Sequence, residues 1–257
     1  MNNIELNDQS ITQIGVEAII DFYNTMAIDK LQLSGLNAFV TGADSPSLNV
    51  VIDTRKNEGF SSEIINAMTD FFNNHQVTWS WFITAVAVAD DMEKCGFEFL
   101  YQSPGMYFDL SNKLQVIDDN LIIKEANDDL REWIEPLLEG FPSESGEDDD
   151  VYRKLNARLL LNGEKKLRHF TIYFNNEPAC SGTLFLSDNS VMLHNLATKN
   201  KFRKRGFGAA LTLYMMSEAK KLGYKHCFLD SSDEGFSLYS KLGFKVYCVT
   251  SVYKRKG

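Results

Sequence analysis

The chain has 257 residues, enough for one large domain or two smaller ones, and it carries a formal net charge of −9 with a sequence pI of about 5.0. Its acidic average surface repels nucleic acid, and no apolar run approaches the roughly 20 residues needed to span a bilayer. The first residues also lack the basic and then apolar pattern of a signal peptide, so we expect a cytoplasmic protein that has neither nucleic acid nor a membrane as a partner.

The N-terminal half reads as a mixture of helices and strands. Apolar residues over Ile11–Met26 have the spacing of a helix. Leu36–Val40 and Leu48–Ile52 read as strands, and the turn residues between them predict a hairpin. A helix capped by Ser61 or Ser62 is expected to run to about Asn74. The other predicted elements of this half are a strand over Thr78–Ala85, a short helix near Asp90–Cys95, and strands over Phe97–Tyr101 and Met106–Leu110.

A polar stretch with little pattern, Ser111–Asn120, is interpreted as a linker. We therefore expect an N-terminal domain over residues 1–112 and a second domain over residues 121–257. The second range mixes strands and helices as an α/β domain does, with a hairpin turn at Asn175-Asn176-Glu177-Pro178. Its predicted strands are Leu121–Lys124, His169–Phe174, Ala179–Leu186, Val191–Ala197, His226–Leu229 and those that fill Phe244–Tyr253; its predicted helices are Asp128 or Asp129 to Gly140, Val151–Leu161, Gly206–Leu222 and Phe236–Leu242.

The two halves have a weak internal similarity. Gly59-Phe60 precedes Gly96-Phe97 by the same interval at which Gly206-Phe207 precedes Gly243-Phe244, and each interval holds a long helix, a strand and a short helix. This pattern predicts a duplicated unit whose N-terminal copy is shortened at its start. The copies differ where chemistry matters, because the first has Glu58, Ser61 and Met92 where the second has Arg205, Gly208 and Tyr239.

The four cysteines are widely separated and form no Cys-x-x-Cys pair: Cys95, Cys180, Cys227 and Cys248. Neither a metal site nor a disulfide framework is indicated. We expect small buried thiols, as in a reducing cytosol.

A basic, glycine-containing segment, Arg203-Lys204-Arg205-Gly206-Phe207-Gly208, lies between a predicted strand and a predicted helix. The first N–H groups of a helix have no intrahelical partner, and the helix dipole adds positive charge, so a helix start suits phosphate. Glycines let the backbone approach an anion closely. The segment lacks the Gly-Lys-Ser/Thr of a P-loop and the third glycine of a Rossmann fingerprint. It therefore predicts a phosphorylated ligand bound in neither of those ways.

Two motifs in the second range recur together in a known family. The segment Arg203–Gly208 has the pattern Arg-x-x-Gly-x-Gly after a strand, and Leu238–Phe244 has the pattern Leu-Tyr-x-x-Leu-Gly-Phe. Together they resemble the motifs of the GNAT superfamily of acetyl-CoA-dependent N-acetyltransferases, over about Leu121–Gly257. The resemblance implies an α/β GNAT (acyl-CoA N-acyltransferase) fold, with a mixed, mostly antiparallel sheet flanked by helices. It also implies that the preceding domain is a smaller, truncated and degenerate GNAT-like α/β domain.

The resemblance implies acetyl-CoA as the cofactor. Backbone amides of the glycine loop would bind its pyrophosphate, beside the charges of Arg203 and Lys204; these amides belong to Arg205, Gly206, Phe207, Gly208 and Ala209. The main chain of Leu196, Ala197 and Thr198 would pair with the pantetheine arm. The family often has an asparagine before the last helix, and Ser232 or Ser231 would take its place here.

The catalytic groups also follow from the resemblance. Tyr239 matches the tyrosine that protonates the departing CoA thiolate. The base is open: His194 is the only titratable side chain of the strand before the loop, and Asp230, Glu125 and a water chain are the alternatives. A cysteine acyl-enzyme is not expected, because no cysteine is paired with a histidine in a recognisable motif.

We therefore expect an N-acetyltransferase that acts by direct attack of a primary amine of a small molecule or peptide. A non-catalytic module that binds acyl-CoA as a sensor, and an enzyme that uses a longer acyl-CoA, are the rival interpretations. The acidic run Glu144–Asp150 would attract a cationic amine or form a solvated loop. The protein is expected to be a monomer or a homodimer.

Overall fold

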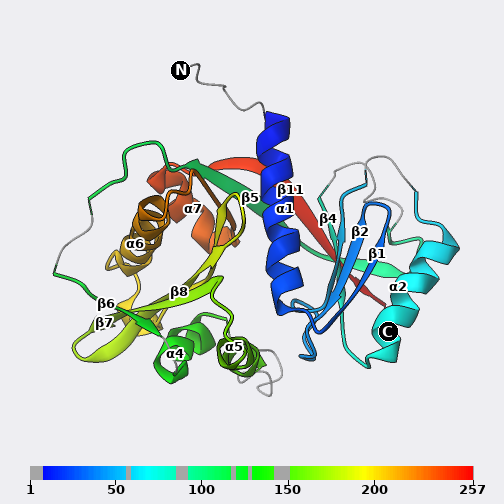
Figure 1. Ribbon diagram of the computed structural model, residues 1–257, viewed down its shortest axis with the longest axis horizontal. Coiled ribbons are helices and arrows are strands. Elements are labelled where there is room, and N and C mark those ends of the chain that lie inside the picture. Colours follow the sequence, from blue (N-terminus) through cyan, green and yellow to red (C-terminus); the bar gives the residue numbers. More distant parts are fainter. Residues whose placement is uncertain are drawn as a thin grey trace. The chain divides into compact units, whose positions relative to one another are not determined.

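The computed structural model describes residues 8–55, 59–84, 92–116, 120–126, 129–141 and 151–256 (Figure 1). The chain forms two compact units. The N-terminal unit comprises Met1–Gly105 and Val246–Gly257, and the C-terminal unit comprises Met106–Lys245. Two long strands, β5 (Phe97–Asp109) and β11 (Lys245–Arg255), contribute residues to both units.

The unit boundaries differ from the predicted ranges 1–112 and 121–257 because two strand segments are exchanged. The end of β11 pairs antiparallel with β4 (Ser80–Ile83), with Tyr253 opposite Trp81, so the last strand belongs to the N-terminal unit. The end of β5 lies in the C-terminal unit, where the Leu110 N–H donates to the Lys225 carbonyl (2.8 Å). Local patterns in the sequence do not report such long-range pairings.

In the N-terminal unit the strand order is β1-β2-β3-β4-β11-β5. The predicted hairpin is confirmed, since β2 (Leu36–Val40) and β3 (Val50–Asp53) pair antiparallel. The predicted cap is also confirmed, since the Ser61 hydroxyl oxygen accepts from the Ile64 N–H at the start of α2 (Ser62–Asn74). Helix α1 (Asp8–Met26) was predicted from its apolar spacing, whereas the mostly exposed strand β1 (Asp29–Leu33) was missed.

The predictions for the middle of the chain are partly wrong. The two strands predicted over Phe97–Tyr101 and Met106–Leu110 form one continuous strand, β5. Gly105 lies within it without ending it: a Cβ atom there would lie 2.6 Å from the Cys248 Sγ, so the glycine permits close approach of β11. The short helix predicted near Asp90–Cys95 lies partly outside the described residues.

The C-terminal unit has the predicted mixed, mostly antiparallel sheet with the strand order β5-β10-β9-β8-β7-β6. Strands β6 to β9 pair antiparallel, and β9 pairs parallel with β10. The predicted turn joins β7 and β8, where Asn175 and Asn176 have φ of 52° and 64°. The strands are β6 (Ile122–Ala126), β7 (Leu167–Phe174), β8 (Glu177–Leu186), β9 (Val191–Thr198) and β10 (His226–Asp230).

Helices cover both faces of this sheet. They are α4 (Arg131–Gly140), α5 (Val151–Leu161), α6 (Phe207–Lys221) and α7 (Asp233–Leu242). The main apolar core holds Leu211 and Met215 of α6 and Leu242 of α7, whereas a smaller core holds Trp133 and Leu137 of α4. Figure 1 shows α6 and α4 on opposite sides of β8. No helix in the described ranges has the length and apolar character needed to cross a membrane.

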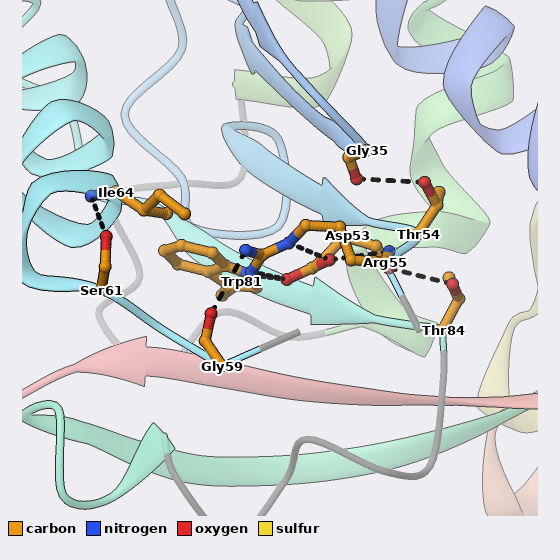
Figure 2. Close-up of polar contacts among 9 residues, drawn as sticks. All are labelled: Gly35, Asp53, Thr54, Arg55, Gly59, Ser61, Ile64, Trp81 and Thr84. Atoms are coloured by element: carbon orange, nitrogen blue, oxygen red, sulfur yellow. Dashed lines mark hydrogen bonds and ion pairs between the residues drawn. The ribbon is translucent and has the colours of Figure 1, made fainter. Parts of the chain in front are cut away.

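A buried ion pair lies at the end of β3 in the N-terminal unit (Figure 2). The Nη2 of Arg55 lies 2.7 Å from the Oδ2 of Asp53, and the two side chains are 3% and 1% exposed. The Trp81 indole N–H also donates to Asp53 (3.2 Å), and the Arg55 guanidinium lies over the Phe60 ring, 5.1 Å from its centre. Both charges are therefore paired and removed from water.

We expect Arg55→Met to lower the free energy of unfolding by about 3–5 kcal/mol, because it leaves the Asp53 carboxylate buried without its charge partner. Urea unfolding followed by far-UV circular dichroism measures the change. Arg131→Met is a matched control, since Arg131 also pairs with a carboxylate two residues earlier, Asp129, but these side chains are 80% and 51% exposed. We expect little change there, and equal effects of the two substitutions would contradict the importance of burial.

Candidate active site

The start of α6 presents unpaired backbone donors. Gly206 is the N-cap with φ of 84°, and no side chain caps the helix. The first backbone bond at this end runs from the Ala210 N–H to the Gly206 carbonyl (2.9 Å). Within the described part of the chain, nothing accepts from the N–H groups of Phe207, Gly208 and Ala209. These groups and the helix dipole make an anion site.

Three exposed basic residues lie before this helix. The Arg203 side chain donates to the Thr198 carbonyl (3.4 Å) and forms an ion pair with Glu234 at the start of α7 (3.3 Å). Lys204 has φ of 61°, and the Arg205 guanidinium lies 5.3 Å from the centre of the Phe174 ring. The predicted basic loop therefore surrounds the helix start with positive charge.

Strands β9 and β10 diverge beside this loop. Their parallel pairing runs from Val191↔Cys227 to Leu193↔Leu229 and ends there, although β9 continues to Thr198. In the part of the chain that the structure describes, the last residues of β9 consequently have β8 on one edge and no paired strand on the other.

A β-bulge turns the end of β9, and the sequence interpretation missed it. The β8–β9 register shifts between Ser181 and Thr183, so that Asn195 and Leu196 together oppose Gly182. Asn195 has φ of 53°, which asparagine tolerates better than most residues. On the sheet face that α4 covers, the Trp133 indole N–H donates to the Gly182 carbonyl (3.2 Å). This bond holds α4 against the bulge.

The bulge decides which backbone groups of β9 face the gap. The Lys199 N–H bonds to the Ala179 carbonyl (2.9 Å), and Ala197 pairs with Ser181. Every second residue of an antiparallel pair bonds to the partner strand, so Ala197 and Lys199 direct their backbone groups to β8. Leu196 and Thr198 therefore direct theirs toward the edge from which β10 has departed.

The end of β9, the loop and α7 meet at Gly208. A Cβ atom placed there would lie 3.4 Å from the Leu238 Cδ2, 3.8 Å from the Thr198 Oγ1 and 4.0 Å from the Leu196 Cδ2. The structure thus brings together the segments that the sequence interpretation assigned to one ligand. The Ala197 side chain is the exception, since it packs with α4 on the opposite face, 2.6 Å from a Cβ placed on Gly140.

Tyr239 lies on α7 in the core that faces α6. It is 8% exposed, and no described residue hydrogen-bonds to its hydroxyl group. Burial, together with the nearby Cys180 and Cys227 thiols, raises the pKa of Tyr239 well above its usual value. The phenol therefore stays protonated at neutral pH and can donate a proton.

Ser232 has a structural task beside any contact with a ligand. Its side chain is the N-cap of α7 and accepts from the Gly235 N–H (3.2 Å). Ser231 is buried, and its hydroxyl donates to the Ser232 carbonyl (2.8 Å). Ser232 remains exposed near the loop, so the predicted ligand contact stays a prediction.

The candidate bases differ in position and acidity. Burial lowers the pKa of His194 to about 3. Asp230 is exposed to solvent, and the protein around it raises the pKa of its carboxyl group above the usual value. Glu125 lies on β6, three strands from β9, and is held by Arg168 at 2.7 Å. The structure therefore does not bring Glu125 to the gap, and it makes His194 a weak base. The acidic run Glu144–Asp150 lies outside the described residues.

The N-terminal unit contains the corresponding strand pair, and its strands stay bonded to each other to the end of the residues described there. Strands β3 and β4 pair parallel up to Asp53↔Ile83. The Thr84 N–H and hydroxyl both donate to the Asp53 carbonyl, at 3.2 and 3.0 Å (Figure 2). The Arg55 side chain folds back onto the same residue and donates to the Gly59 carbonyl (3.5 Å). The backbone carbonyl at the end of β3 is therefore bonded to the chain itself, unlike the open edge at the end of β9.

Comparisons with known proteins agree with this geometry. Residues 165–246 match a family model described as "Acetyltransferase (GNAT) domain". No curated protein matches the sequence. Two solved structures cover almost the whole chain: a GCN5-related N-acetyltransferase from Kribbella flavida (TM-score 0.74, 12% identity, 96% of each chain) and a tandem GNAT protein from the clavulanic acid biosynthesis pathway (TM-score 0.60, 11% identity, 96% of this chain and 88% of that chain). A conserved protein of unknown function from Staphylococcus epidermidis is also similar (TM-score 0.65, 11% identity, 91% of this chain and 97% of that chain).

These matches have two consequences. Residues 165–246 of the C-terminal unit match the GNAT domain model, and the chain as a whole has the GNAT fold in a tandem arrangement. The GNAT-like fold of the N-terminal unit, expected from the resemblance and the internal repeat, is thereby confirmed. At these identities the solved structures show the fold alone.

Proposed function

We propose that this chain, which carries a GNAT domain and has the fold of the GCN5-related N-acetyltransferases, transfers an acetyl group from acetyl-CoA to a primary amine of a small molecule or peptide. The main support for the proposal is that one unit contains three features: the unpaired N–H groups at the start of α6, the diverging strands β9 and β10, and the buried phenol of Tyr239. Family members generally bind acetyl- or acyl-CoA, and the donors available here fit such a group.

The start of α6 would hold the pyrophosphate. The N–H groups of Phe207, Gly208 and Ala209 have no described acceptor, and a Cβ atom on Gly206 would meet no other atom within 4 Å. A doubly charged group can therefore approach the helix end closely. Arg203, Lys204 and Arg205 would add electrostatic attraction, and the backbone of Leu196 and Thr198 would pair with the amides of the pantetheine arm.

Acetyl-CoA supplies an activated acetyl thioester. Backbone donors at the end of β9, beside the bulge, would stabilise the negative charge that develops on the acetyl oxygen as the amine attacks. Tyr239 would protonate the thiolate that departs, so that the C–S bond breaks as the C–N bond forms. Attack is direct, because burial raises the pKa of both Cys180 and Cys227 and keeps them as thiols.

The test is a turnover assay. Release of CoA from acetyl-CoA is measured with a panel of small amines, aminoglycosides and peptides. We expect at least one amine to stimulate release, with formation of its amide seen by mass spectrometry. Binding of acetyl-CoA without turnover of any amine would overturn the proposal in favour of an acyl-CoA sensor, and a preference for longer acyl groups in competition would redefine the donor.

We expect Gly206→Val to weaken CoA binding by about tenfold or more, measured by isothermal titration calorimetry. A side chain there strains the left-handed backbone, which costs roughly 1–2 kcal/mol, and projects toward the phosphate site. Gly223→Val is the matched control, because Gly223 follows the same helix with φ of 92° and equally open space. If both variants bind CoA like the wild type, the phosphate site lies elsewhere.

We expect Tyr239→Phe to lower kcat by roughly 10²–10⁴-fold while the Kd for CoA stays unchanged, because only proton donation is removed. Steady-state kinetics and calorimetry measure the two quantities. Tyr214→Phe on α6 makes the same substitution away from the gap and should leave kcat unchanged. A Tyr239→Phe enzyme with full activity would show that water or another group protonates the thiolate.

We expect one CoA to bind per chain. At the end of β3 and β4, Thr84 and Arg55 bond to Asp53, whereas the edge of β9 beyond Leu193 is left unpaired by β10. Calorimetric titration of the full chain should give a stoichiometry of one, and Gly206→Val should reduce the only binding phase. A second phase that persists in Gly206→Val would contradict the closed state of the N-terminal unit.

A further inference from the structure

The last residue of β10, Asp230, lies at the point where the two parallel strands part. Leu229 pairs with Leu193, and one step further along each strand stand Asp230 and His194. Leu193 and Leu229 belong to the core that contains Tyr239. Side chains alternate along a strand, so Asp230 and His194 project to the opposite face of the sheet. The carboxyl group therefore stands at the mouth of the gap, on the face away from Tyr239.

The carboxyl group of Asp230 is available to a ligand. In the described ranges it has neither an ion pair nor a hydrogen bond, and the residue is exposed. The neighbouring strand β9 contributes His194, which is neutral because burial lowers its pKa to about 3. On β5, burial raises the pKa of Tyr107 to about 12. Other titratable groups on adjacent elements include His226 and Cys227 on β10, Asp109 near the other end of β5, Asp233, Glu234, Tyr239 and Lys241 on α7, and Arg131, Glu132, Glu135 and Glu139 on α4.

We propose that Asp230 takes a proton from the ammonium group of the acceptor, on the sheet face opposite the proton donor Tyr239. This role rests on the proposed acetyl transfer and adds the base that the proposed function leaves open. An attacking amine must be neutral, and an ammonium ion that approaches the open mouth of the gap meets the Asp230 carboxylate. The opposite face is filled by the core around Tyr239.

The reaction needs one group that accepts a proton and one that donates a proton, and Asp230 and Tyr239 supply these on the two faces of the sheet. The acceptor enters as R–NH3⁺ and leaves as an amide with one N–H, so it loses two protons. Asp230 takes the first before the C–N bond forms and returns it to water. The second balances the proton that Tyr239 gives to the CoA sulfur when the C–S bond breaks, so Tyr239 ends protonated.

The other candidates fit this role less well. A histidine whose pKa is near 3 holds a proton too weakly to take one from an ammonium ion at neutral pH. The carboxylate of Glu125 is occupied by Arg168, through bonds of 2.8 and 2.7 Å. Asp230 is exposed and has no partner in the described ranges, and the protein around it raises the pKa of its carboxyl group, which makes the carboxylate a stronger base than an ordinary one.

The experiment compares two amines of nearly equal shape. Ethylamine is protonated at pH 7, whereas 2,2,2-trifluoroethylamine is largely neutral because its fluorines withdraw electrons. Since the natural acceptor is unidentified, both serve as probes at high concentration with the full chain and acetyl-CoA. We expect Asp230→Asn to lower kcat/KM for ethylamine by about 10²-fold or more, and to lower that for trifluoroethylamine far less. As the pH falls, the wild type should lose activity with ethylamine because Asp230 gains a proton, and Asp230→Asn should lack this inflection.

Two controls separate the possible failures. Asp233→Asn removes a carboxylate three residues away on α7 and should leave both amines unaffected, and calorimetry with CoA checks that each variant is folded. Equal losses for both amines in Asp230→Asn, or an unchanged pH profile, would overturn the role of Asp230 while acetyl transfer stands. No turnover of either amine by a wild type that binds acetyl-CoA would overturn the proposed function and this role with it.

Discussion

The parting of two parallel strands is the constraint on which the candidate site depends. Strands β9 and β10 pair only up to Leu193↔Leu229, and the bulge at Asn195 then turns the next backbone groups of β9 toward the open edge. Unpaired backbone groups inside a folded sheet are costly unless something else bonds to them. The amide groups of the pantetheine arm of acetyl-CoA would be such partners. The open edge of the sheet is thus a place where a ligand would complete the hydrogen bonding.

The N-terminal unit shows the same parallel strand pair without that opening. There the carbonyl of Asp53 accepts two bonds from Thr84, and its carboxylate accepts from Arg55 and Trp81. Side chains of the unit thus satisfy the groups that would otherwise need a ligand. The helix start differs as well, because Ser61 caps α2 whereas Gly206 leaves α6 uncapped. A few polar side chains thus distinguish the end of the β3–β4 pair and the start of α2 from the corresponding positions at β9–β10 and α6.

Local features of the sequence predicted most of this arrangement. The glycine loop, the helix after it and the position of Tyr239 depend on residues close together in the chain, and the structure places them as expected. The bulge was missed because it is a mismatch between two strands, although a left-handed asparagine such as Asn195 is compatible with one. The partner of β11 and the exposed strand β1 were missed for related reasons: pairing partners and solvated strands leave weak local patterns. The acidity of His194 depends on burial, which no local pattern reports.

The surrounding protein shifts the pKa of two groups of the site in the same direction. Withdrawal from water disfavours the charged form of an acid, so burial raises the pKa of the Tyr239 phenol, and the protein around the exposed Asp230 carboxyl group raises its pKa as well. The phenol therefore holds its proton at neutral pH, and the carboxylate takes a proton more readily than an ordinary one does. Because the side chains of β10 alternate, the two groups lie on opposite faces of one sheet. The acceptor can thus lose its first proton on the face away from the phenol that protonates the sulfur.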